Sequence, residues 1–284
     1  MKTFTKVWLG IAFLAIGIGT AILIIAVASG VSIKDIPTFS YEETYNDVID
    51  INMDIDYGEV HIMEGESFSI DAQRLPENSL ESYVDGKGTW IIQQSFEKRG
   101  FINIFGVQVP FGDIIGWDEV LTPKITITIP KDFAANNFVV VVKAGEVVVD
   151  RIQANTGSFD VSAGRLVVNE LSIAEKSEYI IGAGQMLLNQ VTLKDITVDC
   201  GIGDVAIRGE INGNNEITCG VGNVELELDG DEADYSYDIS ASIGDVRIDD
   251  NSYQNMSNRI INNNSAENSL SLNCEIGKIS VDFY

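Results

Sequence analysis

The chain has 284 residues, of which 45% are hydrophobic and 21% charged, with 18 Lys and Arg against 43 Asp and Glu. The formal net charge of −25 disfavours nucleic acid as a partner, because nucleic-acid backbones are recognised through Lys and Arg. One histidine and three cysteines exclude a histidine-rich metal site and a dense disulfide framework. The apolar content is high enough to bury a core, which excludes a disordered acidic tail.

The amino terminus predicts a membrane anchor. Residues 7–28 form 22 successive positions without a charged side chain, and a helix rising about 1.5 Å per residue crosses a hydrocarbon core of roughly 30 Å. Lys2 and Lys6 favour a cytoplasmic tail over residues 1–6. The alternative is a cleaved signal peptide, because Ala26-Val27-Ala28 resembles a cleavage site. Both interpretations place the rest outside the cytoplasm, so we expect a single-pass protein of the cell membrane with an extracellular carboxy-terminal domain.

Residues 29–45 are expected to form a linker, and residues 46–130 irregular β-coils. Two segments of this region are loose versions of the repeat that follows: MDIDYGEVHI around Gly58, and KITITIP at 124–130. Between them lies an insertion, residues 95–119, that is rich in aromatic side chains. We regard this insertion as a candidate contact loop, with these aromatic residues: Phe96, Phe101, Phe105, Phe111 and Trp117.

Residues 131–284 carry an internal repeat with a period of about 19–20 residues. Relative to the glycine of each unit, positions −5, −3, −1, +2 and +4 are apolar in all seven units, in a chain that is 45% apolar. We therefore expect five inward-facing side chains per unit. The glycines that define the units are Gly145, Gly164, Gly184, Gly203, Gly222, Gly244 and Gly277.

The spacing of the apolar positions indicates a bend at each glycine. The odd step from −1 to +2 would turn side chains to the opposite face of a straight strand, and glycine permits the backbone angles of a bend. Units of similar length with matching inward positions stack on one another. The pattern thus predicts an all-β fold, a parallel β-solenoid whose open ends need caps. Residues 249–270 hold many asparagines, break the period and predict a polar loop.

The ordered set of units resembles the DUF4097 family. The resemblance rests on the DYGEVHI segment around Gly58, the KITITIP segment at 124–130, and units of the form Gly-Asp-Val-x-Ile, as at Gly203 and Gly244. It covers about residues 46–284. It implies a right-handed β-solenoid, or β-helix, with an adhesin-like role on a bacterial cell surface, behind one membrane helix and without catalytic residues. The aromatic insertion and the asparagine-rich loop depart from the family's pattern.

All three cysteines fall at position −3 and are expected to face inward: Cys200, Cys219 and Cys274. The first two lie one coil apart, at a Cα separation near 4.8 Å that a disulfide can span. The alternative, which we favour, is a ladder of buried unpaired thiols, since other units place small apolar residues there. Cys274 belongs to a later unit, which argues against a three-cysteine metal site. The lone histidine, His61, is expected to be an outward-facing, solvated residue.

Some parallel β-helices are enzymes that cleave polysaccharides, which need acids and bases converging on neighbouring coils. The acidic run Asp229–Asp234 lacks the spacing of a calcium-binding EF-hand loop and is expected to be a solvated turn. The outward position +1 shows no stacked acid pair beside a base, because it holds Glu146, Arg165, Gln185, Asp204, Asn223, Asp245 and Lys278. We therefore expect no catalytic site, no metal and no cofactor.

The strongest candidate for an interaction surface is apolar. Position +3 should face outward, yet three successive units place apolar residues there: Val148, Val167 and Leu187. An uncovered apolar stripe on a monomer indicates a contact surface. Our hypothesis is that the aromatic insertion folds over this stripe and makes it an internal patch. The rival hypothesis is that a partner binds there.

Together these patterns predict a non-catalytic, membrane-anchored scaffold or adhesin-like binding domain. We expect its partners to be the membrane, through the amino-terminal helix, and an envelope protein or a glycan, but no nucleic acid. One alternative is a regulatory or sensory ectodomain in an envelope-stress response. It would need a membrane partner, because the predicted tail of residues 1–6 is too short to signal alone. A further alternative is a carbohydrate-active enzyme.

Overall fold

The computed structural model describes residues 38–95, 101–104, 107–110, 122–249, 251–254, 259–261, 263 and 265–284. The predicted tail, the predicted membrane segment and the start of the predicted linker lie outside these residues. Within the described ranges, no helix is both long and apolar enough to cross a membrane. The linker assignment is wrong from Phe39 onward, because residues Phe39–Tyr45 form strand β1 and pair with a strand of the domain.

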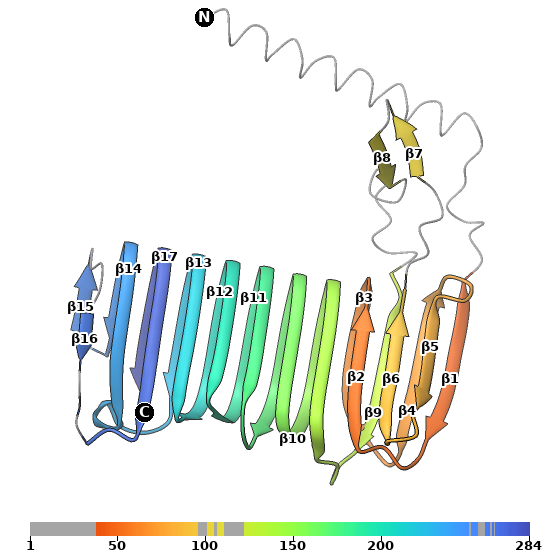
Figure 1. Cartoon of the computed structure of the whole chain (residues 1–284), viewed down its shortest axis with the longest axis horizontal. Coiled ribbons are helices and arrows are strands. Elements are labelled where there is room, and N and C mark those ends of the chain that lie inside the picture. The colour runs from red at the N-terminus through yellow and green to blue at the C-terminus, as the bar shows by residue number, and fades with distance from the viewer. Residues whose placement is uncertain are drawn as a thin grey trace, which may run out of the picture. The chain divides into compact units, whose positions relative to one another are not determined.

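The described residues form an all-β domain with one short 3-10 turn (Figure 1). The predicted polar loop 249–270 is wrong in part, because it contains β15, β16 and the start of β17. In chain order the elements are β1 (Phe39–Tyr45), β2 (Asp50–Ile55), β3 (Gly58–Gly65), β4 (Phe68–Leu75), β5 (Leu80–Val84), β6 (Thr89–Gln94), β7 (Phe101–Ile104), β8 (Val107–Pro110), β9 (Lys124–Pro130), β10 (Ala135–Ile173), β11 (Ser177–Lys194), β12 (Ile196–Asn212), β13 (Asn214–Leu228), η3 (Glu232–Asp234), β14 (Tyr235–Ile248), β15 (Asn251–Gln254), β16 (Arg259–Ile261) and β17 (Asn268–Phe283).

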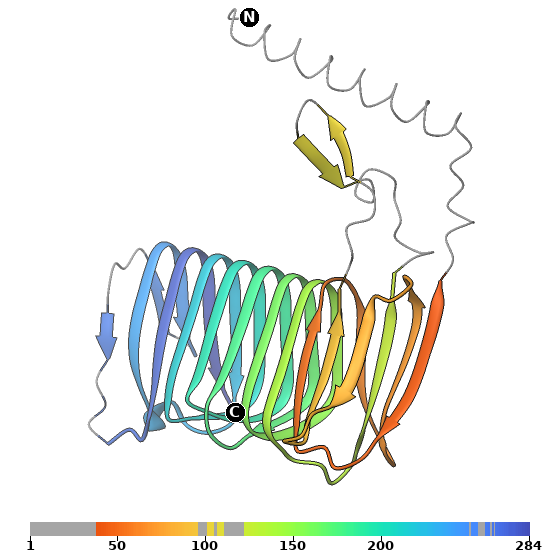
Figure 2. The ribbon, with the colours of Figure 1, turned by 45° about the vertical axis from the view of Figure 1, so that its right-hand side comes forward.

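Mostly parallel pairing stacks the long strands as successive coils, which Figure 2 shows as turns of one wound ribbon. β10 pairs with β11, β11 with β12 and β12 with β13, all in parallel. The units stay in register along this stack, so that Gly164 lies opposite Gly184 and Gly184 opposite Gly203. The predicted all-β, solenoid-like architecture is thereby confirmed.

At both ends of the stack, the order of the coils in space differs from their order in the chain (Figure 1). β17 lies between β13 and β14 and pairs in parallel with both. At the other end, β2 and β3 lie between β10 and the outer strands β6 and β9. At each end, two coils that follow each other in the chain are therefore separated in space by a coil from another part of the sequence.

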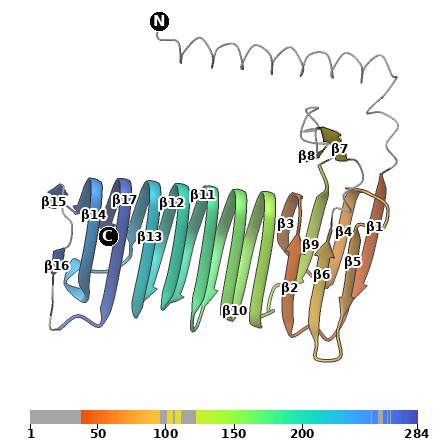
Figure 3. The same cartoon turned by 45° about the horizontal axis from the view of Figure 1, so that its top comes forward.

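Antiparallel strands cover both ends of the stack (Figure 3). β1 pairs with β4, β4 with β9, and β5 with β6 at one end, whereas β15 and β16 both pair with β14 at the other. The Tyr45 hydroxyl donates to the Ser82 carbonyl at 2.9 Å and so links β1 to β5. The expectation of capped ends is confirmed. The caps pair with the outer coils, which would otherwise offer unpaired backbone groups to other chains.

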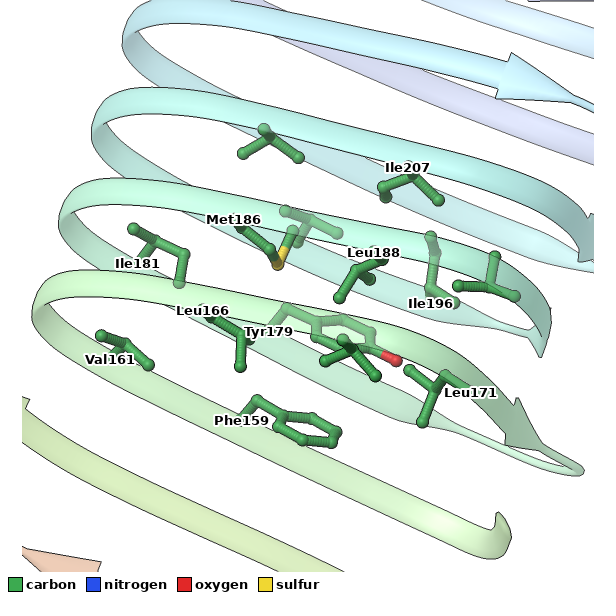
Figure 4. Packing of buried hydrophobic residues seen from close by; sticks show 14 of the residues in the cluster. Phe159, Val161, Leu166, Leu171, Tyr179, Ile181, Met186, Leu188, Ile196 and Ile207 are labelled. Carbon is green, nitrogen blue, oxygen red and sulfur yellow. The ribbon is translucent and has the colours of Figure 1, made fainter. Parts of the chain in front are cut away.

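Inward side chains fill the space inside each coil (Figure 4). Positions −5, −3, +2 and +4 are buried in all seven units, as predicted. The rings of Phe159 and Tyr179 stack with centroids 5.4 Å apart, and Phe138 lies 5.7 Å from Phe159 on the other side. Burial of each such side chain stabilises the fold by roughly 1.5–3 kcal/mol, so this column holds neighbouring coils together.

Position −1 does not follow the predicted inward pattern. The expectation of five inward side chains per unit is wrong at this position, because the chain turns a corner between −3 and +2 in which no side chain points inward. Ala144 is partly exposed, and the residues at −1 in the other units are exposed, namely Ala163, Ala183, Ile202, Val221, Ile243 and Ile276.

Glycine is required at this corner for two reasons. Gly203 and Gly222 both have a φ of 149°, which residues with a Cβ atom rarely adopt. They lie opposite each other on adjacent coils, and a Cβ on Gly222 would lie 1.7 Å from the Gly203 carbonyl oxygen. Backbones at the corner thus approach too closely for any other residue, and the predicted bend at glycine is confirmed.

The corner geometry predicts a large effect of Gly222→Ala. We expect the free energy of unfolding to fall by at least about 3 kcal/mol, because the added Cβ must separate two paired backbones at an unfavourable φ. The matched control is Gly86→Ala, where a Cβ would meet no atom within 4 Å and the expected change is within about 1 kcal/mol. Chemical denaturation followed by circular dichroism measures both variants. Equal stability of the two would contradict the corner geometry.

The position of β17 predicts that its removal detaches β14. Without residues 268–284, β13 and β14 lose their shared partner, so we expect limited proteolysis to remove the segment from Asp229 onward. Removal of Tyr284 alone is the control. It deletes two backbone hydrogen bonds, to Leu228 and Gly230, and should leave the segment protected. Equal protection of both truncated chains would argue against the interleaved order.

Candidate functional site

Four large aliphatic side chains stand in a row along the corner. Ile202, Val221, Ile276 and Ile243 lie in register on the adjacent strands β12, β13, β17 and β14. Their exposed fractions are 61%, 42%, 47% and 65%, in the same order. We call these four residues the corner ridge. Of nine large apolar residues that are exposed in the described part of the chain, four belong to this ridge, so exposed apolar surface is concentrated here.

The repeat pattern predicts that the residues of the corner ridge lie in the core, so this surface was not predicted from the sequence. The sequence nevertheless contains a feature that distinguishes position −1 from the core positions. Ile202 and Val221 each have glycine on both sides, and so does Ala183. A short Gly-x-Gly segment lacks the neighbouring side chains that an ordinary buried strand would pack against the interior. The three coils before the ridge carry only alanine at this position.

The predicted apolar stripe lies at position +3, three residues after the corner glycine. Val167 lies opposite Leu187 on β10 and β11, and it is 8% exposed, whereas Val148 and Leu187 are half-buried. The stripe is therefore less exposed than the corner ridge. Of the aromatic residues proposed to cover it, Phe101 lies in β7, and the other four lie outside the described residues. Both hypotheses for this stripe stay predictions.

The three cysteines form one buried ladder. Cys219 lies in register with Cys200 on one side and with Cys274 on the other. The expectation that Cys274 is remote is wrong, because β17 lies next to β13. All three thiols are free and at most 2% exposed, so the favoured interpretation of unpaired buried thiols is confirmed. A hydrogen bond with Cys200, together with burial, raises the pKa of the Cys219 thiol to about 11, which keeps it protonated at neutral pH.

Charged side chains on the outer faces pair between coils. Arg165 lies 2.8 Å from Glu146 of the coil before it, and the Asn223 amide donates to Asp204 at 2.8 Å. At position +1 these contacts join an acid to a base or an amide, and not two acids to a base. In the described part of the chain, no group of three or more His, Cys, Asp or Glu side chains is placed to hold a metal ion.

Two further expectations about polar residues are confirmed. His61 faces outward and is half-exposed, and its Nε2 atom lies 3.1 Å from a carboxylate oxygen of Asp150. The acidic run Asp229–Asp234 is a turn, because it contains η3 and the Asp231 carboxylate accepts a hydrogen bond from the Ala233 backbone at 2.9 Å. Both features are structural contacts within the domain.

The cysteine ladder predicts a specific thiol count. We expect the folded domain not to react with an aromatic disulfide reagent, and the denatured domain to show three thiols, because all three are buried and unpaired. A disulfide between Cys200 and Cys219 would leave one reactive thiol after denaturation. A sample reduced before denaturation is the control, since it must show three thiols in either case.

No curated protein matches this chain. The chain is similar to a solved structure named a "putative adhesin" from Bacteroides fragilis, at 12% identity over 86% of this chain and 97% of that one, with a TM-score of 0.42. It is also similar to a "putative cell adhesion protein" from Clostridium sporogenes (14% identity, 87% and 100%, TM-score 0.36). A third similar structure is a "putative lipid binding protein" from Parabacteroides distasonis (12% identity, 86% and 97%, TM-score 0.44).

The model of the Toastrack DUF4097 family matches residues 48–282. This match includes both irregular coils at the amino-terminal end of the stack and all seven regular units. It agrees with the resemblance found in the sequence. The chain therefore belongs to the Toastrack DUF4097 family.

Proposed function

We propose that this protein is a non-catalytic binding scaffold, anchored in the bacterial membrane through residues 7–28 and displayed outside the cell. The observation that carries the proposal is the register of the stack. Equivalent outward positions recur at about 4.8 Å from coil to coil, so that a face of the solenoid presents rows of side chains to a partner. Such rows suit an extended contact better than a pocket.

The outward charges support a binding role over a catalytic one. Arg208 lies 2.7 Å from Glu227 of the next coil, and Arg151 lies within 3.5 Å of both Glu64 and Glu170. Hydrolysis of a glycan needs two carboxyl groups that converge on one bond and are available to the substrate. Carboxylates already engaged by arginines of neighbouring coils serve mainly to hold the coils in register.

We place the partner contact on the stripe formed by Val148, Val167 and Leu187. The row continues with the small Ala206 on β12 and then with polar residues such as Glu225 and Ser280, so its large apolar side chains are confined to β10 and β11. A short apolar row with a polar continuation has the composition of a protein contact, in which an apolar centre is bordered by polar residues. The proposed partner is therefore another envelope protein.

Substitution of the stripe tests this function. We expect Val148→Ser combined with Leu187→Ser to reduce the crosslinked partner on intact cells at least about tenfold, while the domain keeps a cooperative melt within about 8 °C of the parent. Glu225→Ser is the matched control at the same position of a later coil, and it should leave capture unchanged. Crosslinked products are identified by mass spectrometry.

Two results would overturn the proposal. If the double variant melts far lower but captures the same partner, the stripe is covered from within the chain, as the insertion hypothesis states. Turnover of a glycan by the purified exported domain would instead show an enzyme. Capture of a glycan without turnover would keep the scaffold and replace the proposed protein partner.

A further inference from the structure

The aromatic insertion replaces the corner of one coil. β6 pairs with β2 up to Gln94, and β9 pairs with β3 from Lys124 onward, so residues 95–123 stand where the other coils turn the corner. The Glu59 backbone N–H donates to the Pro123 carbonyl at 2.8 Å. Glu59 directly follows Gly58, which is the corner glycine of the neighbouring coil. The insertion thus leaves and rejoins the domain at the same edge as the corner ridge. Its residues 100–112 are 13 successive uncharged residues.

The amino-terminal segment reaches the domain at this edge as well. β4 pairs antiparallel with β9, with Gln73 opposite Lys124, and β1 begins at Phe39, opposite Leu75. Leu75 lies beyond Gln73 in the direction of the corner, so Phe39 lies at the level of the corner too. The predicted anchor, residues 7–28, is therefore joined to the solenoid at the edge that carries the exposed aliphatic side chains.

We infer that the corner edge faces the lipid bilayer and that the corner ridge contacts lipid. This inference rests on the anchor of the proposed function, but not on the proposed protein partner. Only about ten residues separate Ala28 from Phe39, which span at most roughly 36 Å, so the edge stays near the membrane. A tethered domain meets the surface at high effective concentration, and a few apolar side chains are then sufficient for contact.

The distribution of side-chain size along the corner disfavours the insertion as the occupant of the ridge. Five coil spacings of about 4.8 Å, or about 24 Å in total, separate Pro123 from Ile202. The coil next to the insertion carries Tyr57 at position −1, and the Tyr57 hydroxyl lies 3.1 Å from the Thr122 hydroxyl. The next three coils carry alanine there, and the large aliphatic side chains lie on the far coils. If the insertion covered the ridge, the large aliphatic side chains would be expected on the coils nearest to the insertion.

The size of the ridge disfavours a second copy of the chain. A stable interface buries about 800 Å² on each partner, which four partly exposed aliphatic side chains do not provide. Insertion into the interfacial region of a bilayer has no such minimum, because it scales with the apolar area that is buried. The ridge suits a lipid surface for this reason.

Charge favours an edge-on orientation. Positions −2 to +1 of the seven units carry three basic and four acidic residues, against 18 basic and 43 acidic residues in the whole chain. In the four units from Gly164 to Gly222, these corner positions hold one charge of each sign, Arg165 and Asp204. Anionic lipid repels the acidic faces of the solenoid, and contact along the corner keeps both faces away from the headgroups.

Photocrosslinking of the full chain tests the inference. The chain is reconstituted into phosphatidylcholine vesicles with p-benzoylphenylalanine in place of Ile202, and in a second variant in place of Ile260. The two isoleucines are 61% and 60% exposed, but Ile260 lies on β16, opposite Asp238 and six residues from the corner. We expect at least about tenfold more lipid adduct at position 202 than at position 260. Circular dichroism checks that both variants fold.

Several outcomes would overturn the inference. Equal lipid adducts at both positions, or none at position 202, exclude a lipid-facing ridge. An adduct of position 202 with residues 96–121 assigns the ridge to the insertion, and an adduct with another copy assigns it to a dimer. Alkaline carbonate extraction of the parent chain separates failure of the anchor from failure of the ridge, because an unanchored chain leaves the vesicles before irradiation. Partner capture on cells then tests the proposed function independently.

Discussion

The close approach of backbones at the glycine corner is the constraint on which the solenoid depends. At Gly203 and Gly222 the chain combines a positive φ with a separation from the neighbouring coil that leaves no room for a Cβ. Each coil must turn at the same place, or its corner would not stack on the coil before it. The register of the interior aromatic column and of the outward charge pairs follows from this shared corner. A change at one corner therefore affects the packing of two neighbours.

The same corner decides which surfaces are available for function. Because no side chain points inward between positions −3 and +2, apolar residues at −1 are directed to solvent and form a ridge. The corner is also the place where the solenoid tolerates an insertion of residues 95–123, since a longer loop there leaves both flanking strands paired. An edge that carries the insertion, the ridge and the first residue of β1 is distinct from the two sheet faces, whose charges pair between coils. The proposed roles of edge and faces, membrane contact and partner contact, are thus spatially separate.

The interleaved ends make contacts between segments that are far apart in the chain. β17 completes the ladder of three cysteines and contributes Ile276 to the corner ridge, although the unit that precedes it in sequence is β14. Pairing on both sides anchors the last strand more firmly than a free terminal coil. The antiparallel caps then cover coils whose order is already locked.

The periodic apolar positions and their glycines were sufficient to predict an all-β solenoid, its bends, its caps and four of its five inward positions, because each depends on spacing along the chain. Position −1 has the same spacing as a core position, and only the path of the backbone at the corner directs Ile202 and Val221 outward. The neighbours of Cys274 were equally inaccessible, since the order of coils in space depends on which edge a later strand fills. Sequence determined what each coil contains, and tertiary structure decided which coil lies beside which and what the corner exposes.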